Sequence, residues 1–176
     1  MSLNIWTPKI EDSKRPVMVW IHGGAWWMGS GNEDLLNPDN ICRNKEFVVV
    51  SINYRLACFG FLRLTDITEG KIDSTGCEAL LDQIEALKWI KKNIQFFGGD
   101  ENNISVIGQS AGGHSISTLI SMPSAQGLFQ KAIICDGGAE TFQPKDESNR
   151  LALKLLEEYK IDPKDIDKIH ALTTEQ

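Results

Sequence analysis

A serine with a glycine two residues before it and another two residues after it carries the clearest chemical signal in this sequence. Ser110 stands in Gly108-Gln109-Ser110-Ala111-Gly112, which matches the G-x-S-x-G pattern of a nucleophile elbow. The apolar, β-branched stretch 104–107 before it predicts a strand, and residues 113–121 after it predict a helix. A sharp turn between a strand and a helix exposes the serine hydroxyl, and flanking glycines relieve the crowding there. The pattern therefore predicts that Ser110 is a nucleophile that attacks a carbonyl carbon.

A second glycine-rich turn lies far upstream of the serine. His22-Gly23-Gly24-Ala25 directly follows Val17–Ile21, an apolar run typical of a buried parallel strand. Such a turn points backbone N–H groups at the oxygen that becomes negative during attack, where one donor is worth about 3–4 kcal/mol. We assign this oxyanion hole to the N–H groups of Gly24, Ala25 and Ala111. The alternative is an ordinary tight turn, which is disfavoured because the elbow follows in the chain order expected of a hydrolase.

A serine nucleophile needs a histidine base and a carboxylate that orients it, and in this chain order both come after the serine. Of the three histidines, His22 belongs to the upstream turn. His114 follows Ser110 so closely that its ring is expected to pack beside the helix rather than face the hydroxyl. His170 lies in a short amphipathic stretch near the end of the chain. None of them is expected to act as the base, so the sequence predicts a nucleophile and an oxyanion hole without the base system.

The order of short motifs along the chain resembles the type-B carboxylesterase family, which includes bacterial para-nitrobenzyl esterases and the cholinesterases. The matching stretches, over residues 3 to about 140, are Leu3-Asn4-Ile5-Trp6-Thr7-Pro8, His22-Gly23-Gly24-Ala25-Trp26, Asn53-Tyr54-Arg55-Leu56, Phe59-Gly60-Phe61-Leu62, Asp82-Gln83, Ala86-Leu87-Lys88-Trp89-Ile90, Asn93-Ile94, Phe97-Gly98-Gly99-Asp100, Asn103-Ile104 and the elbow. The resemblance implies an α/β-hydrolase fold that hydrolyses small-molecule carboxylic esters through an acyl-enzyme. It implies no metal and no cofactor.

Three features depart from the family pattern. The family usually has a glutamate before its nucleophile, whereas this chain has Gln109, which makes cationic substrates such as choline esters less expected. The family often has glycine where this chain has Ala79, and alanine suits a helix better. In the family the acid and the histidine come from a long C-terminal portion, which lies outside this sequence. We therefore expect a fragment of an ester hydrolase, and the alternatives are a catalytically inactive truncated remnant or a non-catalytic, cholinesterase-like binding module.

Strands alternate with helices, which predicts an α/β protein with a mostly parallel sheet between helices. Residues 1–176 are interpreted as one partial α/β-hydrolase domain, with helical decoration from about residue 141. The strands correspond to about strands two to six of that fold, and its first and last two strands are missing. The expected strands are Leu3–Trp6, Val17–Ile21, Phe47–Ile52, Ile104–Gly108 and Lys131–Cys135, and the expected helices are Gly76–Asn93, Gly112–Ser121 and Glu147–Tyr159.

The last predicted strand would leave an apolar edge without a neighbour. Its residues Ala132-Ile133-Ile134-Cys135 carry no charge, and an unpaired edge of this kind favours association. We therefore expect the chain to self-associate or to bind a complementing C-terminal fragment that supplies the acid and the histidine.

Composition excludes several other functions. The apolar fraction of 41% fits a globular protein, and the net charge of −6 argues against binding to nucleic acid or to an anionic membrane. No apolar run resembles a signal peptide or a membrane span, so a cytoplasmic location is expected, although a longer parent chain could carry a signal. The cysteines show no metal-ligand spacing and are expected to be reduced and at least half-buried; they are Cys42, Cys58, Cys77 and Cys135.

Residues near the two turns are candidates for the substrate cleft and its supports. Trp26 and Gln109 are expected to line the cleft, and Trp27 is a further candidate, with packing in the core as the alternative for the tryptophans. Arg55 and Asp100 are expected to form a buried ion pair that braces the loops around the elbow. Asp82 is assigned to a scaffold hydrogen-bond network.

Overall fold

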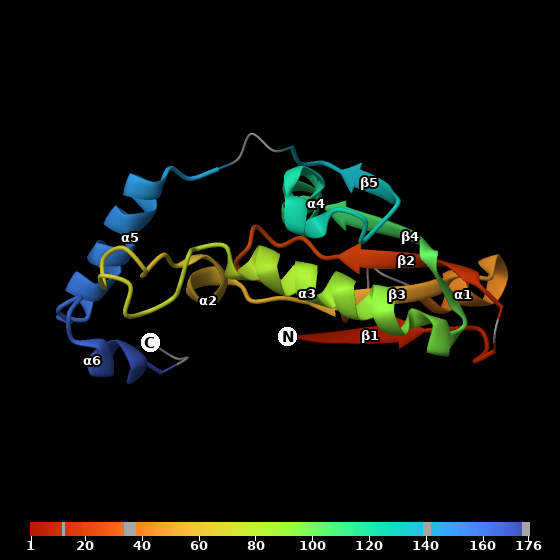
Figure 1. Ribbon diagram of the computed structural model, residues 1–176, viewed down its shortest axis with the longest axis horizontal. Helices are drawn as coiled ribbons and strands as arrows, with labels where there is room; N and C mark the ends of the chain where they lie inside the picture. The colour runs from red at the N-terminus through yellow and green to blue at the C-terminus, as the bar shows by residue number, and fades with distance from the viewer. Residues whose placement is uncertain (12, 34–37, 139–141, 174–176) are drawn as a thin grey trace.

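The computed structural model describes residues 1–11, 13–33, 38–138 and 142–173, and five strands form one sheet within them (Figure 1). The strands are β1 Ser2–Trp6, β2 Arg15–Ile21, β3 Val48–Asn53, β4 Gly99–Gln109 and β5 Lys131–Cys135. Their spatial order is β1-β3-β2-β4-β5, and β1 alone runs antiparallel to its neighbour. The predicted mostly parallel sheet is therefore confirmed.

Three helices, over residues 78–93, 111–121 and 145–158, match the predicted segments to within two residues, and the other helices were not predicted. The α-helices are α1 Pro38–Lys45, α2 Ala57–Phe61, α3 Glu78–Asn93, α4 Ala111–Ser121, α5 Lys145–Glu158 and α6 Ile166–His170, and the 3-10 helices are η1 Ile94–Phe97 and η2 Pro123–Ala125. The predicted boundary at about residue 141 falls outside the described residues. In the described part of the chain, no helix is both long and apolar enough to cross a membrane.

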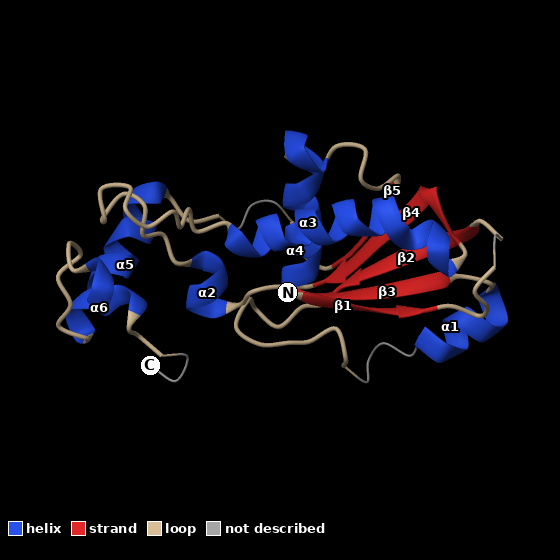
Figure 2. Cartoon of the chain, turned by 60° about the horizontal axis from the view of Figure 1, so that its bottom comes forward, coloured by secondary structure: helices blue, strands red, loops and turns tan. Residues whose placement is uncertain are grey.

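One face of the sheet carries the main core. Alternate residues of β2 are fully buried because helices α3 and α4 cover the face to which they point (Figure 2). The core side chains from the central strands are Val17, Val19, Ile21, Val48, Val50, Ile52, Ile104 and Val106. Helix α1 packs on the opposite face, where Cys42 donates from Sγ to the Trp6 carbonyl oxygen at 3.4 Å.

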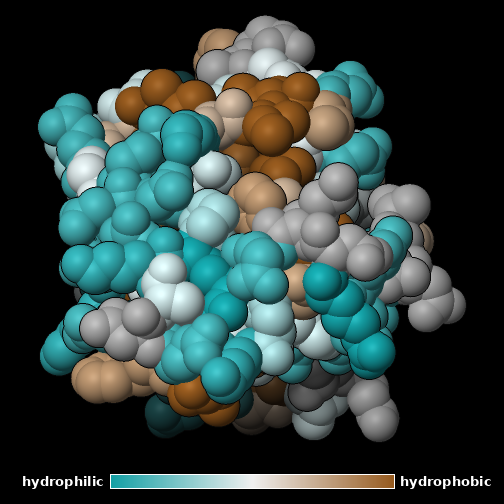
Figure 3. Space-filling model, turned by 90° about the vertical axis from the view of Figure 1, so that its right-hand side faces the viewer, coloured by the Kyte–Doolittle hydropathy of each residue, from teal (hydrophilic) through white to brown (hydrophobic). Residues whose placement is uncertain are grey.

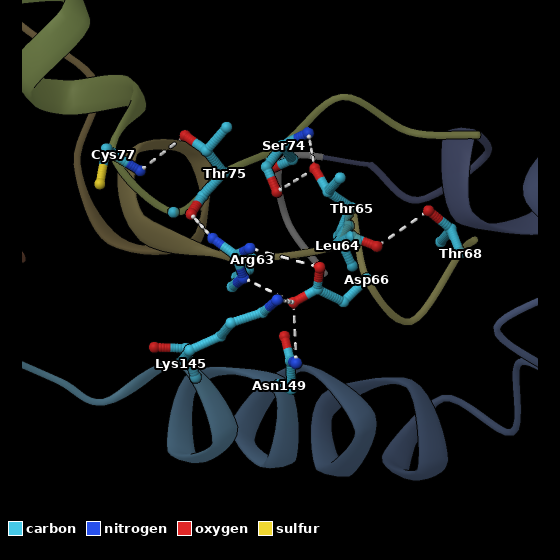
Figure 4. A network of polar contacts seen from close by, with 12 residues as sticks. Arg63, Leu64, Thr65, Asp66, Thr68, Ser74, Thr75, Cys77, Lys145 and Asn149 are labelled. Atoms are coloured by element: carbon cyan, nitrogen blue, oxygen red, sulfur yellow. Dashed lines mark hydrogen bonds and ion pairs between the residues drawn. The ribbon is translucent and has the colours of Figure 1, made fainter. Parts of the chain in front are cut away.

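A second, smaller core lies beyond the carboxyl ends of the parallel strands, where α5 and α6 pack against the segment 62–75 (Figure 1). Asp66 joins segment 62–75 to α5, because it accepts hydrogen bonds from Arg63 Nε and Asn149 Nδ2 at 2.9 Å each (Figure 4). Lys145 Nζ lies 3.2 Å from the same carboxylate. The Arg63 hydrogen bond, followed by that from Asn149, holds the pKa of Asp66 below its usual range. The C-terminal helices are therefore attached to the rest of the molecule by both apolar and charged contacts.

Two structural expectations were wrong. Only Cys42 is buried, whereas three other cysteines are exposed, because they lie at the starts of α2 and α3 and on the edge strand; they are Cys58, Cys77 and Cys135. The ion pair of Arg55 forms with Asp82 and not with Asp100. The Asp100 side chain instead accepts a hydrogen bond from the nearby backbone N–H of Asn102 at 2.8 Å.

Strand β5 forms an open edge of the sheet. All five of its residues are exposed, and Ile133 is 51% exposed. Hydrophobic side chains gather at the top of the molecule, the region in which β5 lies (Figure 3). In the sheet as described, β5 pairs with β4 alone, so its outer backbone groups face away from any neighbouring strand.

Candidate active site

Ser110 lies between the end of β4 and the start of α4. Its backbone has φ 52° and ψ −122°, in a region that residues other than glycine rarely adopt. Its N–H donates to the Cys135 carbonyl oxygen at 3.0 Å, which ties the turn to the end of β5. The strand, the strained turn and the helix thus occur in the order that the motif predicts.

Gly112 allows the nucleophile helix to lie close to the neighbouring strand. A Cβ atom at this position would overlap the Ile21 carbonyl oxygen and lie 2.9 Å from that of His22. Both oxygens belong to backbone at the end of β2, so they cannot rotate away. The absence of a side chain at Gly112 therefore brings the first turn of α4 against the upstream glycine turn.

The upstream turn contains three consecutive residues with positive φ. The φ values are 107° for Gly24, 52° for Ala25 and 62° for Trp26. The Gly24 carbonyl oxygen accepts hydrogen bonds from the N–H groups of Trp27 and Met28 at 3.0 and 3.1 Å, which closes the turn. Successive N–H groups in such a conformation form a concave site for an anion.

The three N–H groups assigned to the oxyanion hole belong to Gly24, Ala25 and Ala111. Within the described residues, none of these three groups donates a hydrogen bond to a backbone or side-chain acceptor. They are therefore free to bind an oxygen that becomes negative during a reaction.

The sheet brings the two turns together. Ile21 and Gly108 are register partners in the parallel β2–β4 pair, so both strands end at the same place. A Cβ atom placed on Gly23 would lie 2.7 Å from the Gln109 carbonyl oxygen and 3.3 Å from the Ser110 Cβ. An open hollow of about 560 Å³ lies over them, lined by Gly24, Ala25, Trp27, Met28, Gln109 and Ser110. Ser110 and two of the proposed donors thus share one cavity.

The two tryptophans of the upstream turn occupy different places. Trp27 is 75% exposed and lines the hollow, together with Met28. Trp26 is half-buried and lies outside that lining, with its ring against Phe61 and His114. Met28 was not predicted from the sequence, and its place two residues after Trp26 in the same turn is the signal that could have indicated it.

Within the residues that the structure describes, none of the three histidines forms a hydrogen bond with the Ser110 hydroxyl. The His22 ring is buried and stacks on Tyr54 with ring centroids 4.4 Å apart. His114 Nδ1 lies 2.5 Å from the Gly138 carbonyl oxygen. His170 is exposed at the end of α6, which packs with α5 in the second core (Figure 1).

The Arg55–Asp82 pair connects the loop after β3 to helix α3. The carboxylate accepts hydrogen bonds from Arg55 Nε and Nη2 at 2.8 Å each and from the Arg55 backbone N–H at 3.0 Å. Burial of Asp82 opposes its ionisation, but these hydrogen bonds outweigh that effect and lower its pKa. The pair is a support of the scaffold, which agrees with the network role expected of Asp82.

A mostly parallel sheet between helices, with a serine elbow at the end of the interior strand β4, defines a protein of the α/β-hydrolase fold. Residues 1–169 match the family model described as the carboxylesterase family, so the chain belongs to the carboxylesterase family.

Named relatives and solved structures agree with this family. The chain is 43% identical over 173 residues to a para-nitrobenzyl esterase of Bacillus subtilis (strain 168), covering 98% of this chain and 35% of that protein. It is 42% identical over 141 residues to acetylcholinesterase-1 of Trittame loki, covering 78% of this chain and 24% of that protein. The carboxylesterase EST55 of Geobacillus stearothermophilus superposes with a TM-score of 0.94 and 38% identity, covering 98% of this chain and 38% of that one. The chain thus spans about a third of the length of the bacterial relatives.

Proposed function

We propose that this chain carries the nucleophile and the oxyanion hole of a carboxylic ester hydrolase. The single observation that supports this most strongly is the shared hollow, which strained Ser110 lines together with Gly24 and Ala25, whose N–H groups are unpaired within the described residues. In the proposed reaction the Ser110 hydroxyl attacks the ester carbonyl and loses its proton to a base. The N–H groups of Gly24, Ala25 and Ala111 stabilise the negative oxygen, the alcohol leaves, and water later hydrolyses the acyl-enzyme.

We propose that the base and its carboxylate come from polypeptide outside these 176 residues. The support is the placement of the histidines, since His22 is stacked in the interior, His114 contacts Gly138, and His170 lies on α6. A complementing segment of this kind needs a place to dock. We place this docking at the open outer edge of β5, because the last residue of β5, Cys135, accepts a hydrogen bond from the Ser110 N–H and so lies beside the site.

The proposed substrates are small, uncharged carboxylic esters. Gln109 carries no charge beside the nucleophile, and Trp27 and Met28 give the hollow a large apolar surface. Para-nitrobenzyl esterase and phenmedipham hydrolase are names of relatives at 43% and 45% identity, and both are hydrolases. The reaction as proposed uses only protein groups and water, so it requires no metal and no cofactor.

Hydrolysis of p-nitrophenyl acetate and butyrate by the purified chain tests the proposal, with Ser110→Ala as the decisive variant. Ser121→Ala is the matched control, because it also removes a serine hydroxyl, but from an exposed position at the far end of α4. Because the base is proposed to lie outside these 176 residues, we expect equal, near-background rates for the isolated chain and both variants. Once a complementing C-terminal segment is added, we expect hydrolysis that Ser110→Ala abolishes and Ser121→Ala leaves intact. Hydrolysis by the isolated chain that Ser110→Ala abolishes would overturn the proposed external base, because a base would then be available within the chain or its assembly. Equal, near-background rates in the presence of the complementing segment would favour the catalytically inactive alternative.

A further inference from the structure

His114 lies where three segments around the hollow meet. It occupies the first turn of α4, and its N–H donates to the Ser110 carbonyl oxygen at 2.9 Å, so its backbone is fixed relative to the nucleophile. A Cβ atom placed on Gly137 would lie 2.7 Å from His114 N and 2.9 Å from the Ser110 carbonyl oxygen. The connection that follows β5 is therefore packed directly against this turn.

The His114 ring contacts two of these segments. On one side, its Nδ1 atom lies 2.5 Å from the carbonyl oxygen and 3.2 Å from the nitrogen of Gly138. On the other side, its centroid lies 5.4 Å from that of the Trp26 ring, with 47° between the ring planes. The ring is half-buried and is held between the connection after β5 and the upstream glycine turn.

Trp26 connects the His114 ring to the proposed oxyanion hole. It directly follows Ala25, and both residues have positive φ. Its carbonyl oxygen accepts a hydrogen bond from Ala57 N at 2.7 Å, and its ring meets Phe61 edge-on with centroids 6.3 Å apart. A left-handed residue other than glycine costs about 1–2 kcal/mol, so two in succession persist only where their surroundings hold them.

We propose that His114 is a positioning residue that holds Trp26 and thereby keeps the Ala25 N–H directed into the hollow. This inference rests on the proposed function, because positioning the N–H matters only where an oxyanion forms. The histidine acts through packing of its ring on Trp26 and through its contact with Gly138. Neither contact involves the transfer of a proton to or from Ser110.

Backbone ¹⁵N and ¹³Cα chemical shifts of Ala25 test the positioning directly and independently of any activity. We expect His114→Ala and Trp26→Leu each to displace the Ala25 resonances, and we expect the double variant to displace them no further. His170→Ala removes an equivalent side chain from an exposed position at the end of α6 and is expected to leave Ala25 unchanged. Unchanged Ala25 resonances in folded His114→Ala would overturn the proposal.

Two further variants keep the test decisive. His114→Phe keeps an aromatic ring beside Trp26 but cannot bond to Gly138. Because the ring packing on Trp26 is retained, the Ala25 resonances of this variant should lie close to their wild-type positions. His114→Gln keeps polar atoms without an aromatic ring and replaces His114→Ala if the latter fails to fold. Wild-type Ala25 shifts in both His114→Gln and Trp26→Leu would refute the positioning role.

Kinetics of the chain with its complementing segment, measured with p-nitrophenyl butyrate, separate positioning from substrate binding. Because a misplacement of about 1 Å can cost about 100-fold in rate, we expect His114→Ala to lower kcat about tenfold while KM stays within about threefold. A raised KM with unchanged kcat would contradict the positioning role. Absence of Ser110-dependent hydrolysis even with the complementing segment would instead contradict the proposed function, and the Ala25 shifts would still decide the role of His114.

Discussion

Replacement of Gly112 by alanine sets two opposing effects against each other at the nucleophile elbow. Alanine is the better helix former by about 1 kcal/mol, and Gly112 lies within α4, so local propensity alone predicts stabilisation. The added Cβ, however, would overlap the Ile21 carbonyl oxygen and lie 2.9 Å from that of His22. A Cβ atom in ordinary contact lies at least 3.4 Å from its neighbours. Relief of the His22 contact alone therefore needs a shift of α4 by about 0.5 Å, and relief of the overlap with Ile21 needs a larger one.

The steric effect is expected to win. Overpacking a well-filled site typically costs about 1–3 kcal/mol, and the upper part of that range applies because the opposing atoms are backbone oxygens of a central strand. After the gain in helix propensity, the expected net loss is about 2 kcal/mol. For a chain of this size, 1 kcal/mol corresponds to about 2–4 °C in Tm, so Gly112→Ala should lower Tm by about 4–8 °C.

Thermal and urea unfolding, followed by circular dichroism, measure this loss. Ser121→Ala also places alanine in α4, but at an exposed position, and it is expected to change the free energy of unfolding by less than about 0.5 kcal/mol. A Gly112→Ala protein as stable as the wild type would refute the reasoning. That outcome would mean that α4 is not held against β2 as closely as the structure indicates.

Two further predictions concern the supports and the edge of the site. Asp82→Asn should cost about 1 kcal/mol at pH 7, a figure kept low because Arg55 is 47% exposed to solvent. Folding lowers the pKa of Asp82, so the extra stability of the wild type over Asp82→Asn is present above the unfolded-state pKa of about 4. It is lost as pH falls through the lower folded-state pKa. Urea unfolding should therefore show a smaller difference in the free energy of unfolding at pH 3 than at pH 7, and a constant difference would contradict this. Ile133→Lys should reduce concentration-dependent association in sedimentation velocity, because a charge on an open edge strand disfavours pairing, whereas a wild-type chain that is monomeric at all concentrations would refute the expectation.

The elements and the two turns were predictable because their signals are local. Apolar runs such as Val17–Ile21 and the alternation of strands with helices follow from side-chain periodicity, which adjacent residues determine. The glycines around Ser110 mark a strained turn in the same way. Parallel strands end on one side of a sheet, so the joint position of Ser110 and the upstream turn also followed once both strands were recognised.

Contacts between distant residues could be decided only by the tertiary structure. The sequence suggested Asp100 as the partner of Arg55, but the packing of α3 against the loop after β3 brings Asp82 to it instead. The small core that joins α5 to segment 62–75 likewise depends on chain segments about 80 residues apart.

The sequence by itself determined which residue is the candidate nucleophile, which turn accompanies it and which kind of sheet presents them, because these depend on residue type and local spacing. Only the tertiary structure decided that Trp27 lines the hollow while Trp26 packs against His114. Adjacent residues in a turn with positive φ point in different directions, and their directions follow from the surrounding packing rather than from their identity.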